Sequence, residues 1–165
     1  MIDLFNIGDV VIYGAQGICK ISCIETKQIG KDIMNYYVLK PIYNENNSVF
    51  VPVDNAVLTA KMKDVLNIEQ AKELIKKASS VEVLSCTGEN QKREQYKDVL
   101  AVADREKLLS LIKTIYKERD ARRDMGKKLN LFDEQALRKA ELLICNELAY
   151  VFNVTPAEAQ NMIVF

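Results

Sequence analysis

Apolar and polar residues alternate with a spacing near two along residues 8–54, and glycines and prolines interrupt the pattern at short intervals. This alternation is typical of β-strands that bury one face. Residues 17–26 predict one such strand, with Cys19, Ile21 and Cys23 on a common face because successive side chains of a strand point to opposite sides. The first third of the chain is therefore expected to form a small sheet.

Two further strands follow in the same region. Residues 28–32 contain a glycine between polar positions and predict a hairpin tip, after which residues 33–40 form the returning strand. Residues 49–53 predict a third strand, which contains Pro52. Because proline donates no backbone hydrogen bond, this strand is expected at an edge of the sheet.

Beyond about residue 55 the apolar residues recur at spacings of three and four, which predicts helices. Two starts carry complete capping boxes, in which Asn67 pairs with Gln70 and Thr155 with Glu158. Further starts are predicted at Asp104 and Asp133, a helix is predicted over residues 96–103, and residues 79–90 are expected to form a connection.

The pattern as a whole predicts an α+β protein with two successive domains. Residues 1–60 are expected to form the β-domain and residues 61–165 an all-helical domain that contains the connection at 79–90. With 165 residues and 48% hydrophobic residues, the chain is long enough to bury a core in each part.

The composition contains no histidine, and this absence removes several classes of enzyme. Ser-His-Asp and Cys-His nucleophiles, HExxH zinc sites and imidazole acid–base chemistry are excluded. Gly14 and Gly17 lie between strands rather than before a helix, so a phosphate-cradling loop is not expected. The protein is therefore expected to be non-enzymatic and to use no cofactor or metal ion.

The four cysteines form no CxxC pair, and no secretory segment stands at the start of the sequence. They are Cys19, Cys23, Cys86 and Cys145. Reduced, structural thiols in a cytoplasmic protein are the expectation, because Cys19 and Cys23 would lie about 13 Å apart along a strand. No apolar run approaches the roughly 20 residues that cross a bilayer, so no membrane partner is expected.

Charge is balanced over the whole chain but not along it. Lys plus Arg and Asp plus Glu both number 23, whereas residues 61–139 carry a net charge of +5. Seven basic and three acidic residues fall within residues 113–128. This segment is either an ordinary solvated helix face or a surface that contacts nucleic-acid phosphates, and composition leaves both interpretations open.

The order of several short motifs resembles the CarD family of bacterial transcription regulators. The motifs are residues 5–13, Gly17, residues 24–26, 36–40 and 51–55, then Tyr96-Lys97, Leu129-Asn130 and Glu147-Leu148-Ala149. The resemblance implies an N-terminal SH3-like or Tudor-like small β-barrel that binds the lobe of the RNA polymerase β subunit. It also implies a helical domain that contacts promoter DNA at the upstream edge of the melted region.

The resemblance also assigns residues to the polymerase contact. The two arginines with which family members dock fall at Lys27 and Phe50 in this sequence. Lys27 keeps the charge but loses the bidentate geometry of arginine, whereas Phe50 favours a more apolar contact. Ile29 and Val51 lie beside these positions and complete the expected polymerase-binding set. An exposed strand edge of this domain could pair with a sheet of the partner.

For DNA the resemblance places a common tryptophan of the family at Lys92, and this chain contains no tryptophan. Lys92 can neutralise a phosphate but cannot replace an indole ring that stacks on a base. The expected contacts are Lys92, Arg93, Tyr96 and Lys97, with Arg122, Arg123, Lys127 and Lys128. Binding to promoter DNA is expected to be weak and largely independent of sequence.

The resulting hypothesis is a monomeric, cytoplasmic regulator that binds RNA polymerase and modulates the stability of promoter open complexes. The alternative is a protein–protein adaptor on RNA polymerase that makes no direct DNA contact, and the missing tryptophan keeps this alternative open.

Overall fold

The computed structural model describes residues 5–44 and 46–165, and the chain divides into two compact units. The β unit extends to Val65, and the helical unit comprises Leu66–Phe165. This arrangement of a β-domain followed by helices confirms the α+β class and is consistent with a Tudor-like β-domain.

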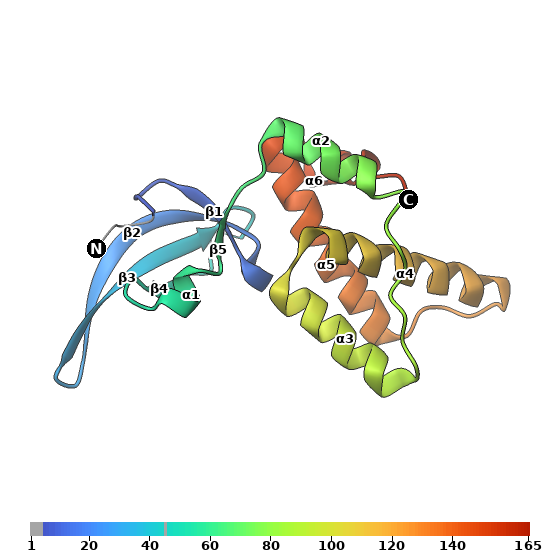
Figure 1. The fold of residues 1–165 in the computed structure, drawn as a ribbon, viewed down its shortest axis with the longest axis horizontal. Helices are drawn as coiled ribbons and strands as arrows, with labels where there is room; N and C mark the ends of the chain where they lie inside the picture. Colours follow the sequence, from blue (N-terminus) through green and yellow to red (C-terminus); the bar gives the residue numbers. More distant parts are fainter. Residues whose placement is uncertain (1–4, 45) are drawn as a thin grey trace. The chain divides into compact units, whose positions relative to one another are not determined.

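The β unit is a five-stranded antiparallel sheet with the order β4-β3-β2-β1-β5 (Figure 1). Its strands are β1 (Val10–Tyr13), β2 (Ile18–Ile29), β3 (Asp32–Pro41), β4 (Val49–Pro52) and β5 (Met62–Asp64). A 3-10 turn, η1 (Gly14–Gln16), joins β1 to β2, and a short helix, α1 (Ala56–Thr59), precedes β5. The predicted edge position of the strand containing Pro52 is confirmed, since β4 pairs only with β3 among the described strands.

One face of the sheet carries the core of the β unit. The buried residues that form this core cluster are Val11, Cys19, Ile21, Tyr37, Leu39, Val51 and Met62. A bulge between Ile21 and Cys23 shifts the register of β2 against β3. Cys19 and Ile21 therefore face the core, whereas Cys23 lies on the opposite face and is only half-buried, so the predicted common face was wrong at Cys23.

The expected boundary at residue 60 falls before the end of the sheet. Strand β5 was not predicted, and it pairs with β1 through Val11 and Asp64. Its three residues are too few to produce a recognisable alternation, and only the ladder to β1 identifies them as a strand. The compact β unit consequently ends at Val65.

The helical unit, Leu66–Phe165, contains five helices in its described residues. They are α2 (Ile68–Lys77), α3 (Glu89–Val102), α4 (Arg105–Asp124), α5 (Leu131–Phe152) and α6 (Pro156–Asn161). Helix α5 packs against the other four and carries Ala140, Ile144 and Leu148 into their shared core. Among the described residues no helix is both long and apolar enough to span a membrane.

Local capping explains most of the helix starts. The capping boxes at Asn67 and Thr155 are both present, and the Asp104 side chain accepts a hydrogen bond from the Lys107 N–H. Helix α5, however, is capped by Asn130, whose side chain accepts from the Asp133 N–H. Asp133 is therefore the third residue of the helix and not its cap, which corrects the predicted start.

Helix α3 begins at Glu89, seven residues before the predicted start at Tyr96. Residues 89–95 are polar and show no apolar periodicity, which is why no helix was predicted over them. The Gln91 side chain binds the backbone N–H and hydroxyl of Thr87 at 2.7 and 2.5 Å. These contacts fix the first turn of α3, so the connection between α2 and α3 ends at Gly88 and not at residue 90.

Candidate functional site

The outer face of the sheet lies opposite the core and collects most of the predicted polymerase contacts. Strand register places Lys27 opposite Met34 and Tyr36 opposite Pro52, and directly paired residues share a face. Phe50 pairs with Val38 and lies on the same face as Tyr36. We call Lys27, Met34, Tyr36 and Phe50 the outer-face cluster.

Aromatic rings and one cation hold this cluster together. The Lys27 ammonium lies 3.5 Å from the centroid of the Phe50 ring and 5.9 Å from that of Tyr36. The two rings meet edge to face with centroids 6.5 Å apart, and the Tyr36 hydroxyl donates to the Met34 sulfur at 3.8 Å. Because 40% of Phe50 remains exposed, the cluster presents an aromatic surface with a positive charge at its centre.

The backbone edge of β4 offers a second contact beside this cluster. The Val53 N–H donates to the Asn35 carbonyl at 2.9 Å, and inward and outward backbone groups alternate along an antiparallel strand. Val51 therefore points its backbone groups toward β3, whereas Phe50 points its N–H and C=O away from it. Pro52 has no N–H, and its carbonyl accepts from the Asn55 N–H at 3.2 Å.

The four predicted polymerase-binding residues do not form one surface. Lys27 and Phe50 are in contact, and Ile29 follows on the same face of β2 toward the hairpin tip, where it is 62% exposed. Val51 is wrong as a side-chain contact, because it faces the core and is completely buried. Tyr36 and Met34 were missed, although both share a strand face in the predicted returning strand 33–40.

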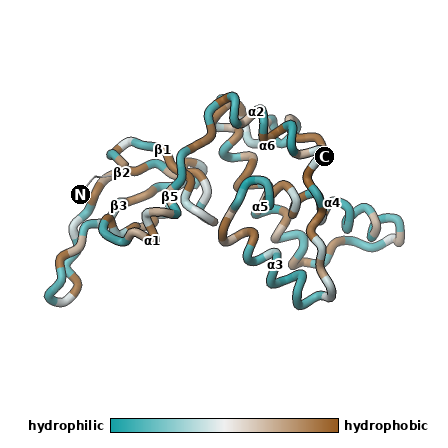
Figure 2. Tube along the Cα trace, viewed as in Figure 1, coloured by the Kyte–Doolittle hydropathy of each residue, from teal (hydrophilic) through white to brown (hydrophobic). Residues whose placement is uncertain are grey.

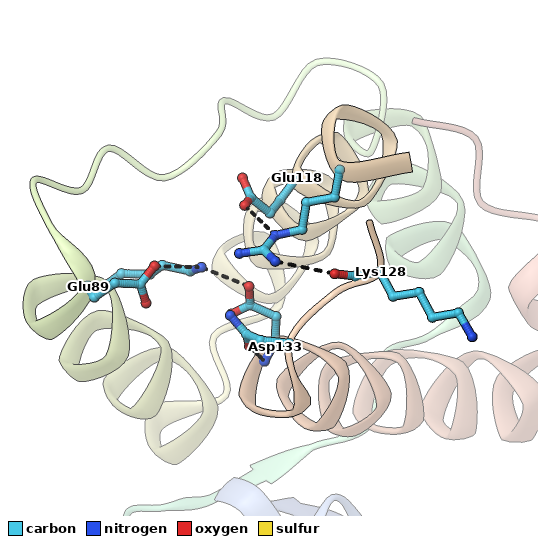
Figure 3. A network of polar contacts seen from close by, with 7 residues as sticks. Glu89, Glu118, Lys128 and Asp133 are labelled. Carbon is cyan, nitrogen blue, oxygen red and sulfur yellow. Dashed lines mark hydrogen bonds and ion pairs between the residues drawn. The ribbon is translucent and has the colours of Figure 1, made fainter. Parts of the chain in front are cut away.

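In the helical unit Lys92 is part of an internal ion pair (Figure 3). Its ammonium lies 2.8 Å from Oδ2 of Asp133 and 3.8 Å from Oε1 of Glu89. The Lys92 side chain is 13% exposed and that of Asp133 only 1%. Lys92 therefore joins the first turn of α3 to that of α5, and the prediction that it contacts a phosphate is wrong.

Tyr96 is also part of the core and not of a surface. Its ring stacks on Phe132 with centroids 6.2 Å apart, and it is 1% exposed. Burial, and next the nearby carboxylate of Asp133, raise the pKa of Tyr96. Tyr96 is therefore removed from the predicted DNA contacts, whereas Arg93 and Lys97 on the same helix are exposed.

Arg93 lies against the first turn of α5. The central carbon of its guanidinium is 5.0 Å from the centroid of the Phe132 ring, whose neighbour in the core is Tyr96. The aromatic pair therefore fixes the place of an exposed cation at the start of α5.

The end of α4 and the turn that leads to α5 carry the second group of predicted DNA contacts, which are Arg122, Arg123, Lys127 and Lys128. Gly126, with φ of 72°, allows the Lys127 N–H to donate to the Arg122 carbonyl at 2.8 Å and the Gly126 N–H to the Arg123 carbonyl at 2.9 Å. This is the Schellman arrangement that ends many helices. The Arg122 side chain binds Glu118 Oε1 at 3.0 Å and the Lys128 carbonyl at 3.3 Å, so it stabilises the turn.

Exposed cations remain on both sides of this turn. Arg123, Lys127 and Lys128 are exposed, and the Lys128 side chain points away from the polar network in Figure 3. Figure 2 shows hydrophilic positions along the end of α4 and into this turn. We call Arg93, Arg123, Lys127 and Lys128 the basic end, because all four flank the start of α5; Lys97 lies one turn further along α3.

The buried cysteines do not have the properties of nucleophiles. Burial raises the pKa of Cys19 to about 12 and that of Cys145 to about 11, so both thiols are protonated at neutral pH. No group of three or more Cys, Asp and Glu side chains in the described part of the chain is arranged to hold a metal ion.

Comparison with known families gives a match to the β unit. Residues 5–66 match the family model of the CarD-like/TRCF RID domain. The matched segment contains all five described strands, helix α1 and the whole outer-face cluster, and it leaves α2 to α6 outside. Residues 5–66 are therefore similar to a CarD-like RNA polymerase-interacting domain, which supports an RNA polymerase-interacting transcription factor.

Proposed function

We propose that the protein is a non-enzymatic regulator that binds the lobe of the RNA polymerase β subunit with its β unit and contacts promoter DNA with its helical unit. The DNA contact lies near the upstream edge of the bubble and changes the stability of the open complex. The match of residues 5–66 to an RNA polymerase-interacting domain supports the protein contact. The exposed basic end supports the DNA contact.

The outer-face cluster is the observation that carries the polymerase contact. Phe50 combines a half-exposed ring with outward backbone groups at the β4 edge. A strand of the partner can bond to that edge, while an acidic side chain beside the strand approaches the Lys27 ammonium over the ring. At the β4 edge the backbone groups of Val51 point toward β3 and Pro52 has no N–H, so Phe50 supplies both the outward donor and the outward acceptor. The ladder to a partner strand is therefore short, and the side-chain contact carries much of the affinity.

The DNA contact is electrostatic and has little base preference. The basic end offers four cations at one end of the helical unit, and Lys97 adds a fifth along α3. Flexible surface cations bind phosphates without reading base edges, so affinity depends on salt and not on sequence. Each contact is weak alone, and binding of the β unit to polymerase supplies the high local concentration that it needs.

The first experiment measures binding to the isolated polymerase β lobe. Lys27→Glu and Phe50→Ala are expected to lower the affinity at least tenfold, because each removes one member of the cation–aromatic contact. Lys63→Glu is the matched control, since Lys63 is an exposed lysine on β5 at the opposite edge of the sheet. Equal binding by all four proteins contradicts the assigned surface.

The second experiment measures open-complex lifetime. Arg123→Glu combined with Lys127→Glu is expected to reduce the effect of the protein on lifetime while leaving lobe binding intact. The control reverses Lys72 and Lys76, whose side chains on α2 are 59% and 76% exposed. No difference between the two double variants contradicts the DNA site.

An adaptor without DNA contact is the second candidate, and two observations favour it. Lys92 and Tyr96, which the family resemblance placed at the DNA, are both inside the helical fold. Footprinting of a polymerase–promoter complex separates the two functions. Protection near the upstream edge of the bubble supports the regulator, and an unchanged footprint supports the adaptor.

A further inference from the structure

The carboxylate of Glu147 holds three hydrogen-bond donors inside the helical unit. Its two oxygens accept from Arg105, Nε to Oε1 and Nη2 to Oε2, each at 2.7 Å. Oε2 also accepts from the backbone N–H of Leu66 at 3.0 Å. Glu147 is 3% exposed on α5, and Arg105 is the first residue of α4.

Leu66 is the first residue of the helical unit, so this contact fixes the chain where that unit begins. The next residue, Asn67, is held by its capping box, with its N–H bound to Gln70 Oε1 at 3.0 Å. On the other side, Asp64 is the last residue of β5 and pairs with Val11 of β1. Val65 is therefore the one residue between two fixed points.

Helix stability alone does not account for a carboxylate at this place. A buried ion pair can often be replaced by apolar side chains of similar volume without loss of stability. An apolar residue at position 147 would still fill the core, but it could not accept the Leu66 hydrogen bond. What the Glu147–Arg105 pair adds is a hydrogen-bond acceptor that fixes Leu66, the first residue of the helical unit.

We propose that Glu147, oriented by Arg105, is a positioning residue that keeps the tether between the β unit and the helical unit one residue long. This inference rests on the proposed function, because its consequence is a higher local concentration of the basic end at DNA once the β unit is bound to polymerase. Without the anchor, residues 65 and 66 become a free tether of two residues. The entropy of loop closure then lowers the local concentration about threefold.

The test combines Arg105→Met with Glu147→Met, which removes both charges and keeps the volume. The double variant is expected to retain its helical circular dichroism and wild-type affinity for the β lobe. Its Leu66 amide exchanges at least tenfold faster. The concentration that gives half of the maximal effect on open-complex lifetime rises about threefold.

A second variant tests the tether without touching the core. Insertion of Gly-Gly-Ser after Val65 leaves Glu147 and Arg105 in place and lengthens the tether to four residues, for an expected loss of about eightfold. The matched control places the same insertion after Glu82, an exposed residue between α2 and α3.

The outcomes separate this inference from the proposed function. If the folded variants bind the lobe and act at the wild-type concentration, the anchor has no positioning role and the inference is wrong. If the wild-type protein neither binds the lobe nor changes open-complex lifetime, the proposed function itself fails. In that case unchanged Leu66 exchange in the double variant independently overturns the anchor.

Discussion

At the scale of single residues, Lys92 illustrates how a surface contact expected from sequence becomes an internal one. The family resemblance placed Lys92 at a DNA phosphate, yet its ammonium is 2.8 Å from Asp133, a residue 41 positions further along the chain. The other oxygen of this carboxylate, Oδ1, is buried and has no hydrogen-bond partner in the described structure. Asp133 therefore depends heavily on Lys92 for compensation of its charge.

Replacement of Lys92 by methionine is expected to destabilise the helical unit. The substitution keeps an apolar stem beside Tyr96 but leaves the Asp133 carboxylate buried and unpaired, which costs about 3 kcal/mol. Urea denaturation measures the loss. Lys97→Met, at an exposed position of the same helix, is the control and is expected to change the free energy of unfolding by less than about 0.5 kcal/mol.

A double variant distinguishes the ion pair from general damage to packing. Adding Asp133→Asn to Lys92→Met replaces the buried charge with a neutral amide and is expected to recover at least half of the lost stability. An equal free energy of unfolding for the wild type and Lys92→Met would show that the pair does not stabilise the fold.

At the scale of elements, local signals were predicted well and distant ones were missed. The capping boxes at Asn67 and Thr155 involve residues three apart, so the sequence alone contains the whole interaction. The edge position of β4 likewise followed from Pro52, because a missing N–H is a property of one residue. The start of α3 lies in a polar segment without apolar periodicity, and strand β5 is defined by its ladder to β1, so neither leaves a periodic pattern in its own segment.

The candidate sites divide in the same way. Lys27 and Phe50 were expected at the same contact, but the cation–aromatic geometry that joins them depends on the ladder through β3. Val51 was assigned to the contact because it follows Phe50 in the sequence. Adjacent strand residues face opposite sides, so Phe50 is exposed whereas Val51 is buried. The bulge in β2 similarly reversed the face of Cys23, since one additional residue in a strand changes every later orientation.

The turn after α4 gives a prediction at the same scale. Gly126 has φ of 72° and open space where a Cβ would stand, so the cost of Gly126→Ala is one of backbone conformation. This substitution is expected to lower the free energy of unfolding by about 1 to 2 kcal/mol. Gly126→Asn is expected to cost less than Gly126→Ala, because asparagine tolerates the left-handed conformation better.

Chemical denaturation of the two Gly126 variants checks the order of their stabilities. The alanine variant should also weaken the effect on open-complex lifetime, since the turn fixes where Lys127 and Lys128 emerge. An alanine variant as stable as the wild type contradicts the assigned role of the turn.

At the scale of the whole molecule, a chain without net charge still separates its charges. Residues 1–60 carry a net charge of −2 and residues 61–139 one of +5, so the polymerase-interacting domain is not the cationic part. Part of the exposed positive charge lies at the basic end, where α4 ends and α5 begins. Attraction to DNA is therefore a local property of one surface and is screened by salt.

Salt dependence provides a quantitative test of that surface in the assembled complex. The logarithm of the binding constant for a polymerase–promoter complex is plotted against the logarithm of the salt concentration. If the four residues of the basic end and Lys97 each neutralise one phosphate, the DNA contacts contribute about −4.5 to the slope of this plot. Lys127→Gln combined with Lys128→Gln is expected to reduce the slope by about 1.8, because two phosphate contacts are lost.

The isolated β lobe and a second double variant supply the comparisons. The two Lys→Gln changes at the basic end should leave the salt dependence of lobe binding unchanged, since the β unit alone makes that contact. Lys72→Gln with Lys76→Gln, on exposed positions of α2, removes the same charge elsewhere and should preserve the steeper slope. If both double variants bind the polymerase–promoter complex with the wild-type slope, the basic end makes no phosphate contact, and the adaptor becomes the better account of the helical unit.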